Sequence, residues 1–277
     1  MANRRATDRP KDIAVLGCRH PHFADYVAAI ERTPGVRLSC LWDRRGAAAA
    51  AATSGAAVLE PAAWPADVAA VIVSSETVRR PADVATALRG GPRPIFVEKP
   101  LGFGAAAAEV AALLAGVGGR FHTGFFLRRV PALVRLRALL REGALGSPFH
   151  ASVRFMHDGA RTGRLEPSCW LRDPALAGYG GFGDLGIHAI DLLRWLGLRP
   201  LDPVHAAIET SAGRGWGEHA GSATYRFPGG HARVLIGWSG AGGSMLDVEL
   251  LGDAGALAAN RCLDSTYALA DAGAERS

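Results

Sequence analysis

Short apolar runs alternate with helical stretches over residues 12–126, and this alternation limits the fold more than any other feature of the chain. Apolar runs bounded by turn residues are typical of strands buried on both faces. Strands that alternate with helices predict a doubly wound parallel sheet, which is an α/β fold. We expect strands at residues 12–17, 36–42, 68–73, 94–97 and 120–126, and helices at residues 23–32, 46–57, 81–89 and 105–114.

The pattern changes after about residue 125, where strands follow one another with glycine-rich turns between them. Such a series predicts an α+β domain with a mostly antiparallel open sheet. We therefore predict a disordered tail over residues 1–11, a Rossmann dinucleotide-binding domain over 12–123, and a domain for substrate binding and oligomerisation over 124–277. In this last domain we expect helices at residues 131–142 and 183–196, and strands at residues 149–155, 204–210, 221–227, 231–238 and 245–251.

The first predicted strand ends in Gly17 and a helix follows it, which is how a dinucleotide-binding turn begins. The glycine fingerprint of such turns is incomplete, because Arg19 and His22 stand where the second and third glycines belong. Backbone N–H groups at the helix start still attract phosphate, and Arg19 can pair with it directly. Two interpretations stay open: a working dinucleotide site, which we favour, and ordinary loop residues with an impaired site.

Asp43 lies at the end of the second predicted strand, near the position that contacts the ribose in dinucleotide-binding domains. An acid there accepts hydrogen bonds from both ribose hydroxyls and repels a 2′-phosphate, which favours NAD. The neighbouring Arg44 can instead bind that phosphate, which favours NADP. The sequence thus predicts NAD or NADP as the cofactor, with NAD slightly favoured.

Glu98-Lys99-Pro100 follows the fourth predicted strand, and ligands of open α/β sheets bind beyond the carboxyl ends of the strands. Pro100 restricts Lys99 to an extended or turn conformation. Lys11 and Lys99 are the only lysines among the 31 basic residues. Arginine stays protonated near neutral pH, whereas a partly desolvated lysine can exchange a proton. Lys99 is therefore a candidate for acid–base chemistry.

A glycine-rich segment, residues 178–183, leads into a predicted helix that carries Asp184 and His188. Positions i and i+4 lie on one face of a helix, so we expect both side chains to point the same way. Carboxylate, imidazole and the ammonium of Lys99 suit reversible hydride transfer from an alcohol carbon, because a base must take the hydroxyl proton as the hydride leaves. The alternative is structural: the helix dipole favours Asp184, and His188 is a core histidine.

Together these motifs make the chain resemble the Gfo/Idh/MocA oxidoreductases, the group of glucose–fructose oxidoreductase and inositol 2-dehydrogenase. The resemblance rests on the glycine-ended first strand, the E-K-P after the fourth strand and the glycine segment before D-x-x-x-H, and it covers about residues 12–257. The sequence departs from the pattern at the glycine fingerprint and at Tyr179, and we expect an abridged C-terminal domain. Typical family connectors stand in the same order at Gly124-Phe125 with Arg128, at residues 142–148 and at residues 170–174.

The resemblance implies a role for each candidate residue. Lys99 would lie beside the nicotinamide and help deprotonate the reacting hydroxyl, His188 would be its acid–base partner, and Asp184 would bind substrate. The substrates of the family are sugars, inositols and related polyols, so we expect a molecule of this class. The resemblance places Gly17, Arg19, His22, Asp43, Arg44, Ser74, Glu98 and Lys99 at the cofactor, and Arg128, His157, Arg172 and Tyr179 at the wall of the substrate pocket.

The predicted function is therefore NAD(P)-dependent hydride transfer to or from a hydroxyl or carbonyl carbon of a sugar, cyclitol or polyol. Two alternatives stay open: a redox-neutral sugar-modifying enzyme that uses NAD, and a non-catalytic nucleotide-binding relative. We also expect a homodimer or homotetramer through the C-terminal sheet, because an apolar sheet face left uncovered tends to mark an association surface.

Composition argues against several other classes of protein. With 49% hydrophobic and 21% charged residues the chain is typical of globular proteins, and no apolar run approaches the roughly 20 residues of a membrane helix. The basic N-terminal segment has no apolar stretch behind it, so we expect a cytoplasmic protein. The arginines behind the net charge of +5 are scattered, and we expect no nucleic-acid partner. The four cysteines form no CxxC pair and His20 and His22 have no acidic cluster, so we expect free thiols and no metal site.

Overall fold

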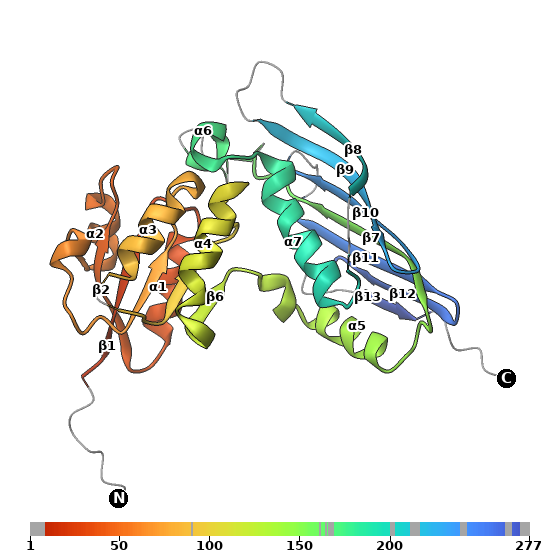
Figure 1. The fold of residues 1–277 in the computed structure, drawn as a ribbon, viewed down its shortest axis with the longest axis horizontal. Coiled ribbons are helices and arrows are strands. Elements are labelled where there is room, and N and C mark those ends of the chain that lie inside the picture. Colours follow the sequence, from red (N-terminus) through yellow and green to blue (C-terminus); the bar gives the residue numbers. More distant parts are fainter. Residues whose placement is uncertain are drawn as a thin grey trace, which may run out of the picture. The chain divides into compact units, whose positions relative to one another are not determined.

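The chain forms two compact units, shown in Figure 1. The N-terminal unit comprises residues 1–124, 169–171 and 175–178, and the C-terminal unit comprises residues 125–168, 172–174 and 179–277. Each unit is built around its own sheet, and the α/β fold predicted from the sequence is confirmed. The computed structural model describes residues 9–89, 91–160, 162–163, 165, 169–199, 203–210, 217–238, 243–263 and 268–271.

The sheet of the N-terminal unit is parallel, with the strand order β3-β2-β1-β4-β5-β6. The order reverses between β1 and β4, and ligands of doubly wound sheets bind at such a switch point. The elements are β1 (Lys11–Leu16), α1 (Phe23–Arg32), β2 (Val36–Trp42), α2 (Ala48–Ser54), β3 (Ala57–Val58), η1 (Pro61–Ala63), β4 (Ala70–Val73), η2 (Thr77–Arg79), α3 (Arg80–Ala87), β5 (Ile95–Val97), α4 (Ala105–Ala115), η3 (Gly118–Arg120) and β6 (Phe121–Thr123).

Apolar side chains pack on both faces of this sheet, because successive side chains of a strand point to opposite faces. On one face Val71 and Val97 are fully buried in a cluster that includes Val84 of α3 and Val110 of α4. On the other face the fully buried Val15 packs in a second cluster beside α1. These two layers fix the strands whose carboxyl ends carry the candidate site.

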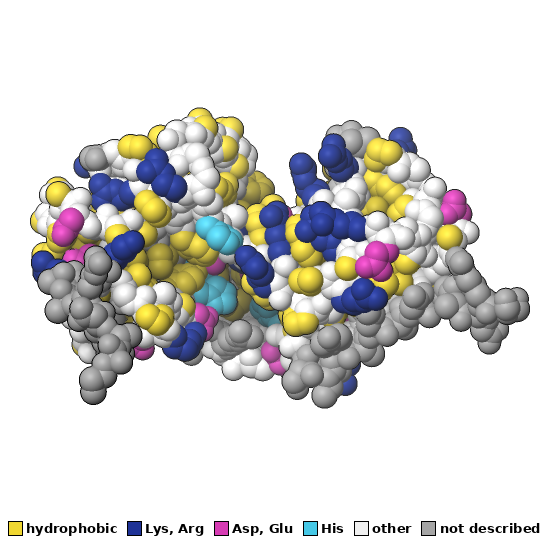
Figure 2. Space-filling model, turned by 90° about the horizontal axis from the view of Figure 1, so that it is seen from below, with side chains coloured by type: hydrophobic (Ala, Val, Ile, Leu, Met, Phe, Trp, Pro, Cys, Tyr) yellow, Lys and Arg dark blue, Asp and Glu magenta, His cyan; other side chains and the backbone are white. Residues whose placement is uncertain are grey.

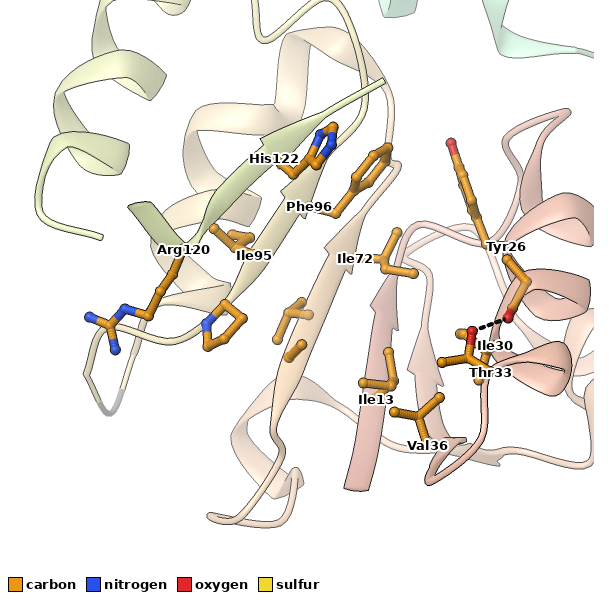
Figure 3. A pocket seen from close by; sticks show the side chains of 14 residues that line it. Ile13, Tyr26, Ile30, Thr33, Val36, Ile72, Ile95, Phe96, Arg120 and His122 are labelled. Carbon is orange, nitrogen blue, oxygen red and sulfur yellow. Dashed lines mark hydrogen bonds between the residues drawn. The ribbon is translucent and has the colours of Figure 1, made fainter. Parts of the chain in front are cut away.

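Part of the second face of the same sheet lies open beside α1. Ile72 of β4 and Phe96 of β5 are half-buried there and line a groove of about 440 Å³ with Tyr26 and Ile30 of α1 (Figure 3). The side chains on the opposite faces of β4 and β5, such as Val71 and Val97, are fully buried, whereas the unbroken apolar sequence of β4 predicts burial on both faces. The groove is therefore an apolar hollow on the sheet face.

The C-terminal unit contains a mixed sheet with the order β13-β12-β11-β7-β10-β9-β8. Its β7 and β10 are parallel, and its other described pairs are antiparallel, as predicted for most of the sheet. The segment between β7 and α7 contains η5 (Trp170–Arg172) and α6 (Pro174–Ala177). The other elements are η4 (Phe126–Arg129), α5 (Pro131–Arg141), β7 (Pro148–Met156), α7 (Gly181–Trp195), β8 (Pro203–Thr210), β9 (Glu218–Phe227), β10 (Gly230–Gly237), β11 (Met245–Gly252), β12 (Gly255–Asn260) and β13 (Ala268–Asp271).

Helix α7 packs on β7, β9 and β10, while α5 packs on β12 and β13 (Figure 1). The side chains that point away from these helices include polar pairs: Arg154 donates a hydrogen bond of 2.9 Å to Asp247, and His150 lies 3.2 Å from His231. This corrects the expectation of an uncovered apolar face, because polar side chains alternate with the buried ones on these strands. On the face seen in Figure 2, basic side chains gather over the C-terminal unit.

Several predicted elements differ from the observed ones. The strand expected over residues 120–126 covers only Phe121–Thr123, and η4 begins at Phe126. Between them Gly124 passes so close to Glu98 that an added Cβ would lie 2.8 Å from its Oε1. The alanine-containing strands β3, β12 and β13 were not predicted, since alanine favours helix. Residues 1–8 of the predicted disordered tail lie outside the described residues, and Lys11 begins β1.

Candidate functional site

The predicted cofactor residues follow four strands of the parallel sheet at one edge. Gly17 comes after β1, Asp43 after β2, Ser74 after β4 and Glu98 after β5. The carboxyl ends of parallel strands meet at the same edge, which is where open α/β sheets bind ligands. The structure therefore brings together the residues that the sequence assigned to the cofactor.

Gly17 forms a turn that no other residue fits. Its φ is +89°, and a Cβ added there would lie 2.2 Å from the backbone nitrogen of Ser75. The hydroxyl of Ser74 donates a hydrogen bond of 2.5 Å to the carbonyl oxygen of Gly17. Ser74 thus ties β4 to the turn after β1 and has a structural role at this edge.

Asp43 ties the same turn to β2. One carboxylate oxygen accepts a hydrogen bond of 2.9 Å from the N–H of Cys18, and the other accepts one of 2.8 Å from the N–H of Arg45. A carboxylate has about four acceptor positions, so Asp43 keeps acceptor capacity for a ribose hydroxyl. The guanidinium of Arg44 lies over the ring of Trp42, 5.6 Å from its centroid. Burial and the charge of Asp43 raise the pKa of the Cys18 thiol to about 12.

Two histidines occupy the turn where the fingerprint lacks its glycines. The N–H of His22 donates a hydrogen bond of 3.1 Å to Nδ1 of His20, and the ring of His22 lies 2.9 Å from the carboxylate of Asp25. The ring of His20 is buried between His22, Tyr26 and Trp170, and this burial lowers its pKa well below the usual range. No signal in the sequence indicated this packing of His20 in the turn. Arg19 is exposed.

Glu98 anchors the strand end that carries Lys99. Its carboxylate accepts a hydrogen bond of 2.8 Å from the hydroxyl of Tyr26 and a second one from the backbone N–H of Lys99. Burial and the neighbouring Glu98 raise the pKa of Tyr26. Glu98 and Lys99 are 4% and 7% exposed, and the Lys99–Pro100 peptide bond is cis. Glu98 thus holds the backbone from which the Lys99 side chain extends.

In the C-terminal unit, Asp184 and His188 lie one turn apart on the buried side of α7, as predicted. Nε1 of the fully buried Trp238 donates a hydrogen bond of 3.2 Å to Asp184. Asp184 and His188 belong to the C-terminal unit, whereas Lys99 belongs to the N-terminal unit. The imidazole of His188 packs edge-on against three aromatic rings. The three rings are those of Phe125, Phe126 and Phe155, with centroids 5.9, 5.2 and 6.0 Å from that of His188.

The residues predicted for the pocket wall have structural partners in the same unit. The guanidinium of Arg128 donates two hydrogen bonds to the carboxylate of Asp191, and the one from Nε is 2.9 Å long. Arg172 is buried and donates a hydrogen bond of 2.8 Å to the carbonyl oxygen of Leu165. Tyr179 is buried. His157 stacks on the ring of Trp238, with 6.3 Å between centroids, and so contacts the residue that holds Asp184.

Other features of the described residues do not add to this site. The apolar groove in Figure 3 contains Tyr26 but none of the residues predicted to bind cofactor or substrate. Among the residues that the structure describes, no group of three His, Cys, Asp or Glu side chains could hold a metal ion. No helix in the described part of the chain has both the length and the apolar character needed to cross a membrane.

Sequence comparisons relate the chain to known proteins. Residues 133–258 match the GFO/IDH/MocA C-terminal domain. The chain is 35% identical to an inositol 2-dehydrogenase of Acidothermus cellulolyticus over 132 residues, and 36% identical to the rhizopine catabolism protein MocA of Rhizobium meliloti over 122 residues. These alignments cover 47% and 43% of this chain and 35% and 34% of the relatives, so they span about a third of each relative's length.

Solved structures with similar folds include two with bound cofactor. GenD2 from gentamicin A biosynthesis, in complex with NAD, is 27% identical with a TM-score of 0.78, over 94% of this chain and 75% of that one. The WlbA dehydrogenase from Bordetella pertussis, in complex with NADH and UDP-GlcNAcA, has a TM-score of 0.82 over 98% of this chain and 79% of that one. At 19% identity the second likeness shows the fold alone.

Proposed function

We propose that this chain is a member of the Gfo/Idh/MocA family and, as such, a nicotinamide-dependent oxidoreductase acting on a sugar, cyclitol or related polyol. It transfers hydride between the cofactor and a hydroxyl or carbonyl carbon. The observation that carries the proposal is Lys99, buried at the carboxyl edge of the parallel sheet on the same edge as the Gly17 turn. A lysine at that position can exchange a proton where a dinucleotide binds.

The residues at this edge fit a nicotinamide dinucleotide. The turn at Gly17 admits no Cβ, and backbone N–H groups at the start of α1 attract phosphate. Asp43 supports NAD because it repels a 2′-phosphate, while Arg44 is the group that would favour NADP. The NAD complex of GenD2 adds support for NAD. We propose Arg19, His22, Ser74 and Glu98 as further residues around the cofactor.

The proposed chemistry gives each of the three candidate residues a role. A bound nicotinamide would supply the hydride acceptor or donor. In the oxidation direction, a ring nitrogen of His188 takes the proton of the substrate hydroxyl, and the alcohol carbon becomes a carbonyl. The ammonium of Lys99 donates a hydrogen bond to the reacting oxygen and takes part in the transfer by exchanging a proton with it as negative charge develops there. Asp184 binds a neighbouring hydroxyl, and Trp238 fixes the orientation of its carboxylate.

The test is an assay of the purified protein with NAD or NADP and a panel of polyols that includes myo-inositol. We expect reduced nicotinamide to accumulate with at least one polyol, and His188→Ala to abolish most of that signal. An isomerised polyol without reduced nicotinamide would support the redox-neutral alternative. If none of the panel is changed although the dinucleotide binds, the dehydrogenase assignment is wrong.

We further propose that the protein is a homodimer or homotetramer, and that the sheet face opposite α5 and α7 is the contact surface. The exposed face of β10 mixes an apolar side chain, Leu235, with Arg233 and His231, which is a typical composition for an interface. Light scattering at about 50 μM should give at least twice the monomer mass, because an interface of standard size is saturated there. A monomer at that concentration would contradict this proposal.

A further inference from the structure

Helix α7, which carries Asp184 and His188, has no capping side chain of its own. The residue at its N-cap is Gly180, and the first turn contains glycine at positions 181 and 183. The first four N–H groups of a helix lack partners within the helix, and serine, threonine, aspartate or asparagine usually binds one of them. In α7 another part of the chain must supply this partner.

Glu218, the first residue of β9, supplies it. Its Oε1 accepts a hydrogen bond of 2.7 Å from the N–H of Gly180 and one of 3.1 Å from the N–H of Gly183. A carboxylate at a helix N-terminus also interacts favourably with the helix dipole, and bonds to an ionised acceptor are stronger than neutral ones. Glu218 therefore caps α7 from a strand 35 residues further along the chain.

The sheet holds the first turn of α7 at very short range. A Cβ added at Gly181 would lie 2.7 Å from the carbonyl oxygen of His219 and 2.8 Å from the indole of Trp238. One added at Gly183 would lie 3.1 Å from Oε1 of Glu218. The same Trp238 donates a hydrogen bond to Asp184. Thus β9 and Trp238, the residue after β10, fix both the backbone of the first turn and the carboxylate of Asp184.

We propose that Glu218 is a positioning residue for the oxidoreductase reaction, an inference that rests on the proposed function of Asp184 and His188. By binding two N–H groups at the helix start, Glu218 keeps the first turn of α7 wound. Asp184 lies in that turn and His188 lies one turn later, so both side chains keep the orientation in which they meet substrate. Without the cap the first turn frays, and the two groups spend less time in the productive arrangement.

The test compares Glu218→Ala with Glu218→Gln, whose amide oxygen can still accept both hydrogen bonds. Glu209→Ala is the matched control, because Glu209 is an exposed glutamate on the neighbouring strand β8. On the polyol that the wild type turns over fastest, we expect Glu218→Ala to lower kcat about tenfold. The free energy lost with one helix cap corresponds to a rate factor of about this size. The KM for the dinucleotide should stay unchanged, Glu218→Gln should recover most of the kcat, and the control should match the wild type.

Amide hydrogen exchange of the peptide that contains residues 180–188 provides a second readout, which needs no substrate. Exchange in this peptide should be faster in Glu218→Ala than in Glu218→Gln or Glu209→Ala. If the wild type turns over no polyol, the proposed function fails, whereas the exchange result still decides whether Glu218 caps α7. Unchanged exchange, or normal kcat in a Glu218→Ala protein that only melts at a lower temperature, would overturn the proposal.

Discussion

Replacing Gly17 by alanine perturbs the turn at the centre of the candidate cofactor site. The substitution places a left-handed φ of +89° on a residue with a side chain, which costs about 1–2 kcal/mol. It also pushes a Cβ to within 2.2 Å of the nitrogen and 2.4 Å of the Cα of Ser75, and backbone atoms cannot move away as a flexible side chain can. Overpacking of this kind costs a further ~1–3 kcal/mol.

We therefore expect Gly17→Ala to lower the free energy of unfolding by about 2–5 kcal/mol in urea titrations. Gly35→Ala is the matched control, because Gly35 has a φ of +77° and no atom within 4 Å of an added Cβ. It should lose only the conformational part, about 1–2 kcal/mol. Calorimetry should show weaker dinucleotide binding in Gly17→Ala alone. Equal losses of stability in the two variants would refute the argument from close backbone approach.

Three further predictions concern other parts of the chain. Asp43→Ala should weaken dinucleotide binding and narrow the preference between NAD and NADP; calorimetry giving an unchanged ratio would mean that other groups set it. Asp12 has its pKa lowered mainly by the hydrogen bond from Arg37, so its stabilising effect is present at neutral pH and lost as the carboxylate is protonated. Arg37→Met should accordingly lower the melting temperature at neutral pH, and this effect should disappear only in acid strong enough to protonate Asp12 in the folded protein, which lies below the usual pKa of aspartate. The Cys18 thiol, with its pKa raised to about 12, should resist a thiol reagent that labels the more exposed Cys169, as mass spectrometry of the labelled peptides will show.

Local sequence patterns were enough to predict most of the fold. The helix Phe23–Arg32 and the strand Val36–Trp42 match their predicted bounds to the residue. The apolar positions follow the helical period in the first segment and the strand period in the second, and Gly35 marks the turn between them. The strand β12 was missed because its residues are mostly small and its strand character comes from pairing with β11.

The candidate site could be predicted only in part, because its supporting contacts join distant segments. Lys99, Asp184 and His188 stand out in local motifs. Tyr26 is 72 residues from Glu98, and Trp238 is 54 residues from Asp184, so no local pattern indicates either hydrogen bond. One feature of the sequence indicates that α7 is capped from elsewhere, namely a helix start made of glycines without a capping side chain.

The central claim is that Lys99 takes part in proton transfer at the reacting hydroxyl, and turnover by Lys99→Arg tests it most directly. The variant keeps the positive charge but cannot exchange a proton near neutral pH. The measurement is kcat on the polyol that the wild type oxidises, with dinucleotide affinity determined on the same sample. We predict a kcat lower by about 10²–10⁴-fold with little change in that affinity, because general acid–base groups contribute rate factors of this size. Near-normal kcat in Lys99→Arg would contradict the account and remove Lys99 from the mechanism.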